Sequence, residues 1–256
     1  DTETGLLFDV LLHIGTLAAI CVVYYKDVLK MIVEGIGLIR DCIINFVRFI
    51  GNKTGRTDEP YLRLVNSSYR KLVVLIIVST IPTGIIGVVG KDVVEMASEI
   101  LLIPGICLIL TAVLLFIADH AKDGDKLPKG VTYTNAFGVG IAQGIATLPG
   151  LSRSGTTITA CLLSGFNRNF AVKYSFLMSI PAILGALVLE LKDYTAAALS
   201  GAEIAYYVVG MIVAAVVGYV CIKTMLIVVR RKKFTGFAIY CLIVGVISIG
   251  GYIYMA

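Results

Sequence analysis

Residues 131–167 read VTYTNAFGVGIAQGIATLPGLSRSGTTITACLLSGFN, and they carry a single charged side chain, Arg153. Two apolar arms flank Pro149-Gly150, a pair that stops a helix and permits a tight turn. The basic groups on either side, within 119–130 and at 168–173, are both expected on the inner face of a membrane. The stretch therefore predicts a re-entrant hairpin that enters and leaves by the same face. Its tip must be buried in protein or line a water-filled cavity.

The chain around this hairpin is far more apolar than a soluble protein. Of its 256 residues, 58% are hydrophobic and 15% are charged, against about 45–50% and about 25% in a typical soluble domain. Charge-free runs of roughly membrane-spanning length recur, and a run over 10–25 joins them if Asp9 lies at the interface. These runs cover residues 72–90, 100–118, 130–152, 174–189, 204–222 and 234–256. We predict an all-α, polytopic helical membrane protein, since the weak alternating decamers of a β-barrel are absent from the sequence.

Lysine and arginine gather in short connections, so the net charge of +5 indicates orientation in a bilayer rather than binding to nucleic acid. The basic stretch 26–71 and RRKK at 230–233 are both expected inside. Within the first, 33–50 mixes apolar and charged residues and favours an interfacial helix over a span. Residues 91–99 have one basic side chain and are expected to form an outer loop. The acidic stretch 119–125, DHAKDGD, is expected to be a solvated linker rather than a metal site.

Two segments resemble each other along the chain. Residues 8–27 and 174–193 both open with an aromatic residue, break mildly at Gly15 or Pro181, and close with Lys-Asp. The basic loops give them opposite orientations, as in an inverted-topology repeat, although chance similarity between two apolar helices is the alternative. We therefore expect one integral membrane domain over 1–256, with the remainder of repeat one in 1–118 and repeat two in 130–256.

A consequence of the repeat concerns the hairpin. The second copy is preceded by the hairpin over 131–167, whereas only seven residues precede the first copy. We expect a first hairpin to be missing from the sequence, and with it half of any site built where the repeats meet.

The hairpin tip carries groups that suit an anion. Ser152 and Ser154 are good helix N-caps, and the N–H groups at such a helix start point toward negative charge. Arg153 adds a planar fork that matches two phosphate oxygens, and Thr157 shares a helical face with Ser154. The tip is expected to cradle a phosphate or diphosphate. The alternative is an interfacial arginine with small residues that help helices pack, but the cost of an arginine at membrane depth favours a functional role.

Several stretches together resemble the undecaprenyl-diphosphate phosphatase family, the membrane enzymes linked to bacitracin resistance. They are TYTNAFGVGIAQGIATLPGLSRSGTT at 132–157, KYSFLMSIPAILGA at 173–186, FAIY at 237–240 and HIGTLAA at 13–19. The resemblance implies inverted repeats whose two re-entrant hairpins meet inside the membrane. It also implies hydrolysis of a polyprenyl diphosphate to the monophosphate, in a bacterial plasma membrane, which recycles the lipid carrier of cell-wall synthesis.

The resemblance also implies roles for residues of the tip. The catalytic residues would be Ser152, Arg153 and Ser154. The diphosphate-binding residues would be Gly150, Arg153, Ser154, Gly155 and Thr157. The partners would be the lipid substrate and the bilayer, with no nucleic acid, and a homodimer is left open.

One departure from the family pattern concerns the first hairpin, E-G-x-T-E-F-L-P-V-S-S-T-G-H, which this sequence does not contain. In the family that element is thought to supply metal ligands and the attacking or proton-transferring group. Mg²⁺ or another divalent cation is expected as cofactor, with ligands in the missing hairpin, because the present one offers no carboxylate. As written, the chain is expected to be inactive.

Other readings of the sequence stay open. A transporter or flippase of a polyprenyl phosphate, or of another anionic lipid, also fits inverted repeats with a midplane anion site. A membrane scaffold without activity is disfavoured by the Ser-Arg-Ser element. His13 is a candidate acid or base, although a lone histidine in an apolar run more often packs with a hydrogen bond. The six cysteines form no CxxC pair and are expected to be small buried hydrophobes.

Overall fold

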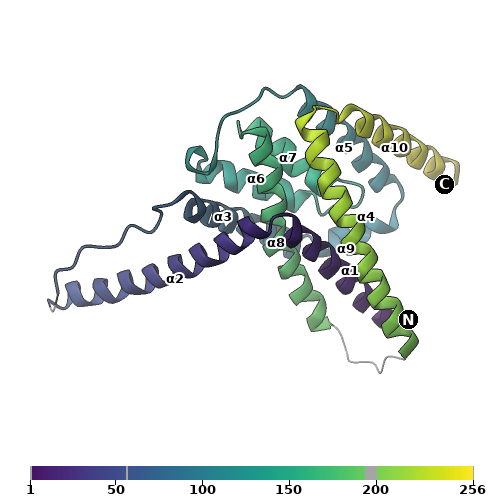
Figure 1. The fold of residues 1–256 in the computed structure, drawn as a ribbon. Coiled ribbons are helices and arrows are strands. Elements are labelled where there is room, and N and C mark those ends of the chain that lie inside the picture. Colours follow the sequence, from purple (N-terminus) through teal and green to yellow (C-terminus); the bar gives the residue numbers. More distant parts are fainter. Residues whose placement is uncertain (1, 56, 194–200, 256) are drawn as a thin grey trace.

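The computed structural model describes residues 2–55, 57–193 and 201–255, which form α-helices and one short 3-10 helix (Figure 1). These described residues contain no β-strand beyond two isolated bridges at 124–167 and 126–166. The first helices are α1 (Thr2–Val23), α2 (Tyr25–Lys53), α3 (Ser68–Val89), α4 (Lys91–Glu99) and α5 (Leu102–His120). The remainder are η1 (Pro128–Gly130), α6 (Tyr133–Ile145), α7 (Arg153–Leu163), α8 (Arg168–Asp193), α9 (Gly201–Arg230) and α10 (Thr235–Met255).

Five helices are long and apolar enough to cross a membrane, by length and composition, and this confirms the predicted all-α polytopic class. Their apolar spans are Ser68–Val89, Leu102–His120, Arg168–Leu189, Glu203–Arg230 and Thr235–Tyr254. In α1 the apolar part is the shorter Val10–Val23. Many apolar side chains of α3, α9 and α10 are exposed, as expected of helices whose outer surface meets lipid rather than water.

Helix α2 is longer than the predicted interfacial segment 33–50 and is not among the candidate spans. It follows α1 after a break at Tyr24 and projects from the helix bundle (Figure 1). Apolar side chains such as Ile36 and Phe46 are exposed along it, together with charged ones such as Arg40. This mixture suits a helix lying in the interface between lipid and water, the alternative that the sequence favoured over a span.

A buried ionic cluster fixes α2 to α3. Arg70 of α3 lies 2.5 Å from Asp41 and 3.0 Å from Glu34, both on α2, and the side chains of Arg70 and Asp41 are buried. Asp41 also accepts a 2.9 Å hydrogen bond from exposed Arg40. The guanidinium groups of Arg70 and Arg40 hold the pKa of Asp41 below its usual value. The cluster joins α2 to the first turn of α3 and so helps set the angle at which α2 leaves the bundle.

The two mild breaks expected at Gly15 and Pro181 are wrong, because α1 and α8 continue through both residues. Gly15 instead permits a close approach of two helices, since a Cβ there would lie 2.4 Å from the carbonyl oxygen of Met211 on α9. A small residue at such a contact lets membrane helices pack backbone to backbone.

The segments expected on the inner face come together at one end of the bundle. Asp27, after α1, lies 2.9 Å from Lys173 at the start of α8. Arg230, at the end of α9, donates a 2.9 Å hydrogen bond to Asn169. These contacts bring the segments together, and the membrane face on which they lie stays a prediction.

Three local expectations are corrected. Residues 91–99 form helix α4 rather than a loop, because Ala97 of their apolar face is buried.

The linker 119–125 is not simply solvated: Asp123 lies 2.8 Å from both Arg168 and Lys232 and ties α8 to the end of α9. Of the cysteines, Cys107 and Cys161 are buried but Cys42 and Cys221 are exposed, on helices whose outer surface is itself apolar.

Candidate active site

Helices α6 and α7 form the two arms of the hairpin, and one lysine ties their outer ends together. The ammonium group of Lys126, in the connection after α5, donates a 2.8 Å hydrogen bond to the carbonyl oxygen of Ser164 and a 3.4 Å bond to the side chain of Asn135. Its backbone N–H donates to Gly165 at 3.2 Å, and its carbonyl accepts from Asn167 at 2.9 Å. Both ends of the hairpin therefore lie at the same end of the bundle, as a re-entrant hairpin requires.

The tip of the hairpin lies at the middle of a membrane-spanning helix. The hydroxyl of Thr111 donates a 3.1 Å hydrogen bond to the carbonyl of Gly150 and accepts a 3.0 Å bond from the backbone N–H of Ser152. Thr111 is the central residue of α5 (Leu102–His120), so ~14 Å of helix separates it from either end. The turn that the sequence places at Pro149-Gly150 is thus held close to the middle of the length of α5.

The turn itself requires glycine at position 150. Gly150 has a φ of +86°, in the left-handed region that side chains other than glycine rarely adopt. A Cβ added there would also lie 2.4 Å from the carbonyl oxygen of Pro104 on α5. The close approach of the tip to α5 therefore requires a residue without a side chain at position 150.

Helix α7 begins at this turn with its first N–H groups directed out of the helix. Ser152 is the N-cap, and its hydroxyl oxygen accepts a 3.1 Å hydrogen bond from the N–H of Gly155. Gly155 is buried, and a Cβ there would lie 2.9 Å from that oxygen. The N–H groups of Arg153 and Ser154 have no acceptor within the helix, because both residues belong to its first turn. They are available to an anion.

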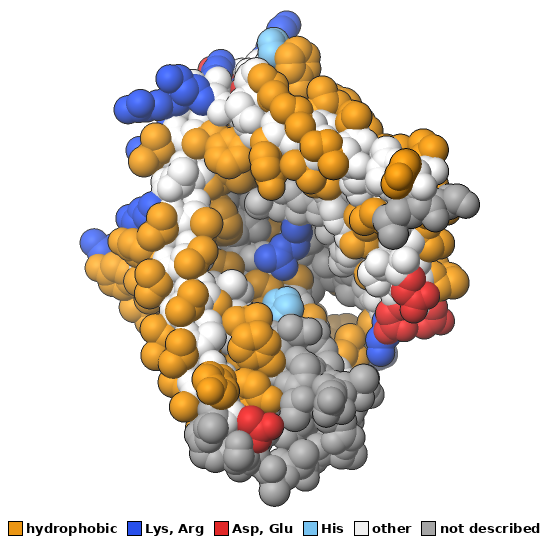
Figure 2. All heavy atoms as spheres, turned by 90° about the vertical axis from the view of Figure 1, so that its right-hand side faces the viewer, with side chains coloured by type: hydrophobic (Ala, Val, Ile, Leu, Met, Phe, Trp, Pro, Cys, Tyr) orange, Lys and Arg blue, Asp and Glu red, His pale blue; other side chains and the backbone are white. Residues whose placement is uncertain are grey.

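Arg153 is exposed although it lies next to the tip. Its guanidinium makes no hydrogen bond or ion pair with any residue that the structure describes, and the hydroxyl of Ser154 is likewise without a partner among them. Figure 2 shows that one face of the molecule is hollowed between the helices, with basic and histidine side chains in the hollow. An unpaired arginine at this depth in an apolar bundle is costly unless it meets a ligand or water.

Thr157 differs from the other residues of the motif because its hydroxyl faces the interior. The hydroxyl lies 2.5 Å from that of Ser175 on α8 and donates to the carbonyl of Arg153 at 2.9 Å. Thr157 is 1% exposed. In this arrangement it fixes the first turn of α7 against α8, and its role as a diphosphate ligand stays a prediction.

A set of buried hydroxyl and amide groups around the hairpin was not found from the sequence. The hydroxyl of Tyr174 on α8 contacts that of Ser79 on α3 and donates a 2.9 Å bond to the carbonyl of Leu75. Thr83 donates a 2.8 Å bond to the carbonyl of Gly140 on α6. Each of these residues is an isolated polar side chain within an apolar run, and the sequence gives no other sign of its partner.

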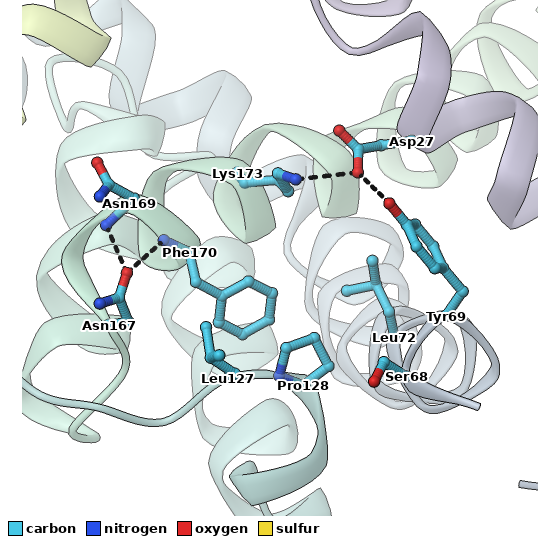
Figure 3. Close-up of a pocket in the computed structure, with 10 residues that line it drawn as sticks. All are labelled: Asp27, Ser68, Tyr69, Leu72, Leu127, Pro128, Asn167, Asn169, Phe170 and Lys173. Carbon is cyan, nitrogen blue, oxygen red and sulfur yellow. Dashed lines mark hydrogen bonds and ion pairs between the residues drawn. The ribbon is translucent and has the colours of Figure 1, made fainter. Parts of the chain in front are cut away.

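A separate cavity of about 270 Å³ lies at the end of the bundle where α2, α3, η1 and α8 begin (Figure 3). Asp27 accepts a 2.8 Å hydrogen bond from Tyr69 and lies 2.9 Å from the ammonium group of Lys173. The charges of this cavity are thus paired with each other, in contrast to Arg153 at the hairpin tip.

The described residues do not form a site for a divalent cation. No group of three or more histidine, cysteine, aspartate or glutamate side chains gathers among them. The hairpin tip offers an arginine and hydroxyl groups, whereas Mg²⁺ is usually held by carboxylates. His13 is exposed on α1, a helix that packs against α8 and α9, and it stays a candidate acid or base.

The family model described as "Bacitracin resistance protein BacA" matches residues 1–247. A protein of Methanosphaera stadtmanae named undecaprenyl-diphosphatase is 38% identical over 247 residues, which are 96% of this chain and 84% of that protein. Proteins of the same name from Alkaliphilus metalliredigens and Treponema denticola are each 39% identical, over 96% and 95% of this chain and 85% and 82% of their own.

Proposed function

The chain belongs to the bacitracin resistance protein BacA family, and from this premise we propose that it is an undecaprenyl-diphosphatase. It is a multi-pass membrane hydrolase that removes the terminal phosphate of a polyprenyl diphosphate and leaves the monophosphate. Its location is the plasma membrane, where the monophosphate returns as the lipid carrier of cell-wall synthesis.

One observation carries the placement of the reaction: the unpartnered guanidinium of Arg153 stands at a helix start held to the middle of α5 by Thr111. A lipid diphosphate brings its negative charge to the membrane, and an unpaired cation beside free helix N–H groups complements that charge. Neither an interfacial anchor nor a packing role accounts for an arginine without a partner at this depth.

The residues of the tip act on the diphosphate as donors. In the reaction a water oxygen bonds to the terminal phosphorus while the bond from that phosphorus to the bridging oxygen breaks. The lipid monophosphate is the leaving group, inorganic phosphate is the other product, and the proton lost by the water passes to the solvent. Arg153 binds the non-bridging oxygens with its fork, and the N–H groups of Arg153 and Ser154 stabilise the charge that grows as the bond breaks. The hydroxyls of Ser152 and Ser154 donate further hydrogen bonds. Gly150 and Gly155 bring this backbone close to the phosphate, and Thr157 completes the set.

A divalent cation stays a prediction for this activity. The described residues gather no group of three or more candidate ligands for such an ion. Chelation by EDTA tests the requirement directly, with loss of activity and its recovery by added Mg²⁺ as the expected result.

The organisation of the chain is part of the same proposal. Repeat one lies within 1–118 and repeat two within 130–256, in one membrane domain. In such a repeat α1 corresponds to α8, and α3 corresponds to α9. The packing of α1 against α9 then has its counterpart in the packing of α8 against α3, and both packings occur. A homodimer is proposed with it, to be tested by the mass of the solubilised protein.

Phosphate release separates this function from a flippase of the same lipid. The full-length protein in detergent is expected to release one phosphate per polyprenyl diphosphate, with the monophosphate lipid as the other product. A flippase moves the lipid without cleaving it. The flippase would be favoured by two results together: the diphosphate lipid stays intact after prolonged incubation with the protein and Mg²⁺, and the same protein transports that lipid in vesicles.

A further inference from the structure

A second basic pocket lies apart from the hairpin tip, at the end of the bundle where the inner-face segments meet. Its volume is about 530 Å³. Four elements contribute to it: the connection before α3, the first turn of α3, η1, and the start of α6. The lining residues are Arg63, Val65, Asn66, Ser67, Lys71, Lys129 and Tyr133.

The three cations of this pocket have no carboxylate partner. Among the described residues, no ion pair joins Arg63, Lys71 or Lys129 to an acidic side chain, and the ammonium of Lys71 lies 3.4 Å from the centre of the Tyr133 ring. Glu34 accepts a 3.0 Å hydrogen bond from the lining residue Ser67, but its carboxylate is already paired with Arg70 at 3.0 Å.

Some basic residues at the same end of the bundle are instead paired with carboxylates. Lys173 is paired with Asp27, and Arg168 and Lys232 are paired with Asp123. An orientation signal requires only positive charge near the membrane, paired or not. Three unpaired cations converging from separate elements on one cavity require a further explanation, and an anion supplies it.

Two helices begin at the pocket and add to its positive potential. Ser67 is the N-cap of α3, and Tyr133 is the first residue of α6. The first N–H groups of each helix are directed out of its start, where the helix dipole favours negative charge. The oxygens of a phosphate can accept hydrogen bonds from these N–H groups and from the three basic side chains.

The surface that continues from the pocket is apolar. Helices α3 and α6 pack against each other, and both expose large hydrophobic side chains. Phe137 follows Tyr133 by one turn on the same face of α6, and Ile81 is exposed on α3. A ligand with a phosphate in the pocket would therefore have apolar surface beside it along the two helices.

We propose that this pocket binds the phosphate of an anionic membrane phospholipid, whose acyl chains lie along α3 and α6. The site is distinct from the hairpin tip, and it does not depend on the hydrolytic function. It holds a structural lipid at the end of the bundle where the hairpin enters, next to the ionic cluster that anchors α2. Basic pockets between membrane helices are suited to such head groups.

The test compares lipid binding by the full-length protein and by the triple variant Arg63→Gln, Lys71→Gln, Lys129→Gln. The probes are dioctanoyl phosphatidylglycerol, dioctanoyl phosphatidylcholine and inorganic phosphate, and the readouts are affinity in detergent and the shift of the thermal midpoint. The wild-type protein is expected to bind phosphatidylglycerol at least tenfold more tightly than the triple variant does. Phosphatidylcholine and phosphate are expected to give no comparable shift.

A matched control removes three other exposed basic side chains from the same end: Lys122→Gln, Arg231→Gln and Lys233→Gln. This variant loses the same charge and is expected to bind phosphatidylglycerol like the wild type. The single variant Lys129→Gln, at an exposed position, gives a second measurement if the triple variant folds poorly. Equal affinity in the triple variant and the wild type, equal loss in the control, or an equal response to phosphate alone would each overturn the proposal.

The readout is independent of the hydrolytic site. The triple variant is expected to release phosphate from polyprenyl diphosphate in detergent at the wild-type rate, because none of its three residues belongs to the hairpin tip. Loss of lipid binding with retained hydrolysis supports the lipid site alone. Loss of both in a protein that remains folded would contradict the separation of the two sites.

Discussion

Replacing Arg153 by alanine is expected to lower kcat/KM for phosphate release from polyprenyl diphosphate by roughly 10²–10³-fold. The guanidinium is the one cation at the hairpin tip and has no partner in the described part of the chain. It is therefore free to neutralise the diphosphate, and no neighbouring charge replaces it when it is removed. Because it makes no contact that holds the fold together, the variant is expected to keep the wild-type thermal midpoint.

Two further variants sharpen this test. Arg153→Lys keeps the charge but loses the planar fork, so it is expected to recover only part of the activity. Arg231→Ala removes an exposed arginine far from the tip in the chain and is expected to leave the rate unchanged. Wild-type activity in Arg153→Ala would show that the tip is not where the diphosphate reacts.

Replacing Gly150 by alanine is expected to lower activity by about tenfold to a hundredfold. The φ of +86° is strained for alanine, at a cost of about 1–3 kcal/mol. The new Cβ would also lie 2.4 Å from the carbonyl oxygen of Pro104, so the tip must shift away from α5. Such a shift moves Arg153, three residues on, from its position against the substrate. Phosphate release and the thermal midpoint, measured on the same preparation, check both effects.

A glycine in the first arm provides the control. A Cβ at Gly138 meets nothing within 4 Å, and alanine is the better helix former by about 1 kcal/mol. Gly138→Ala is therefore expected to keep full activity and at least the wild-type thermal midpoint. If Gly150→Ala behaves the same way, the tip does not depend on the backbone conformation described here.

The hairpin could be predicted because its signals are local. Pro149-Gly150 breaks two apolar arms, and the charges on either side predict both ends at one face of a membrane. In the structure, Lys126 joins these two ends. The N-cap role of Ser152 follows in the same way from residue type and position. Periodicity and charge thus give the class of fold and the shape of the segment that carries the candidate site.

Contacts between distant segments could not be predicted in the same way. The hydrogen bonds of Thr111 set the depth of the tip, but a single threonine within an apolar run does not indicate which residue it bonds to. The side chain of Thr157 lies on the face of α7 that meets Ser175. The packing of α7 against α8 determines that this face is buried, and helical spacing alone does not predict it. A glycine within an apolar run predicts a break, whereas Gly15 serves a close contact with Met211, which lies far along the chain.

Equilibrium binding of a non-hydrolysable polyprenyl diphosphonate tests most directly that the hairpin tip is the diphosphate site. The measurement uses the full-length wild-type protein, Arg153→Ala and the control Arg231→Ala, all in the same detergent. At least tenfold weaker binding to Arg153→Ala, with unchanged binding to Arg231→Ala, is the predicted result. Equal affinity of all three proteins for the diphosphonate would contradict it.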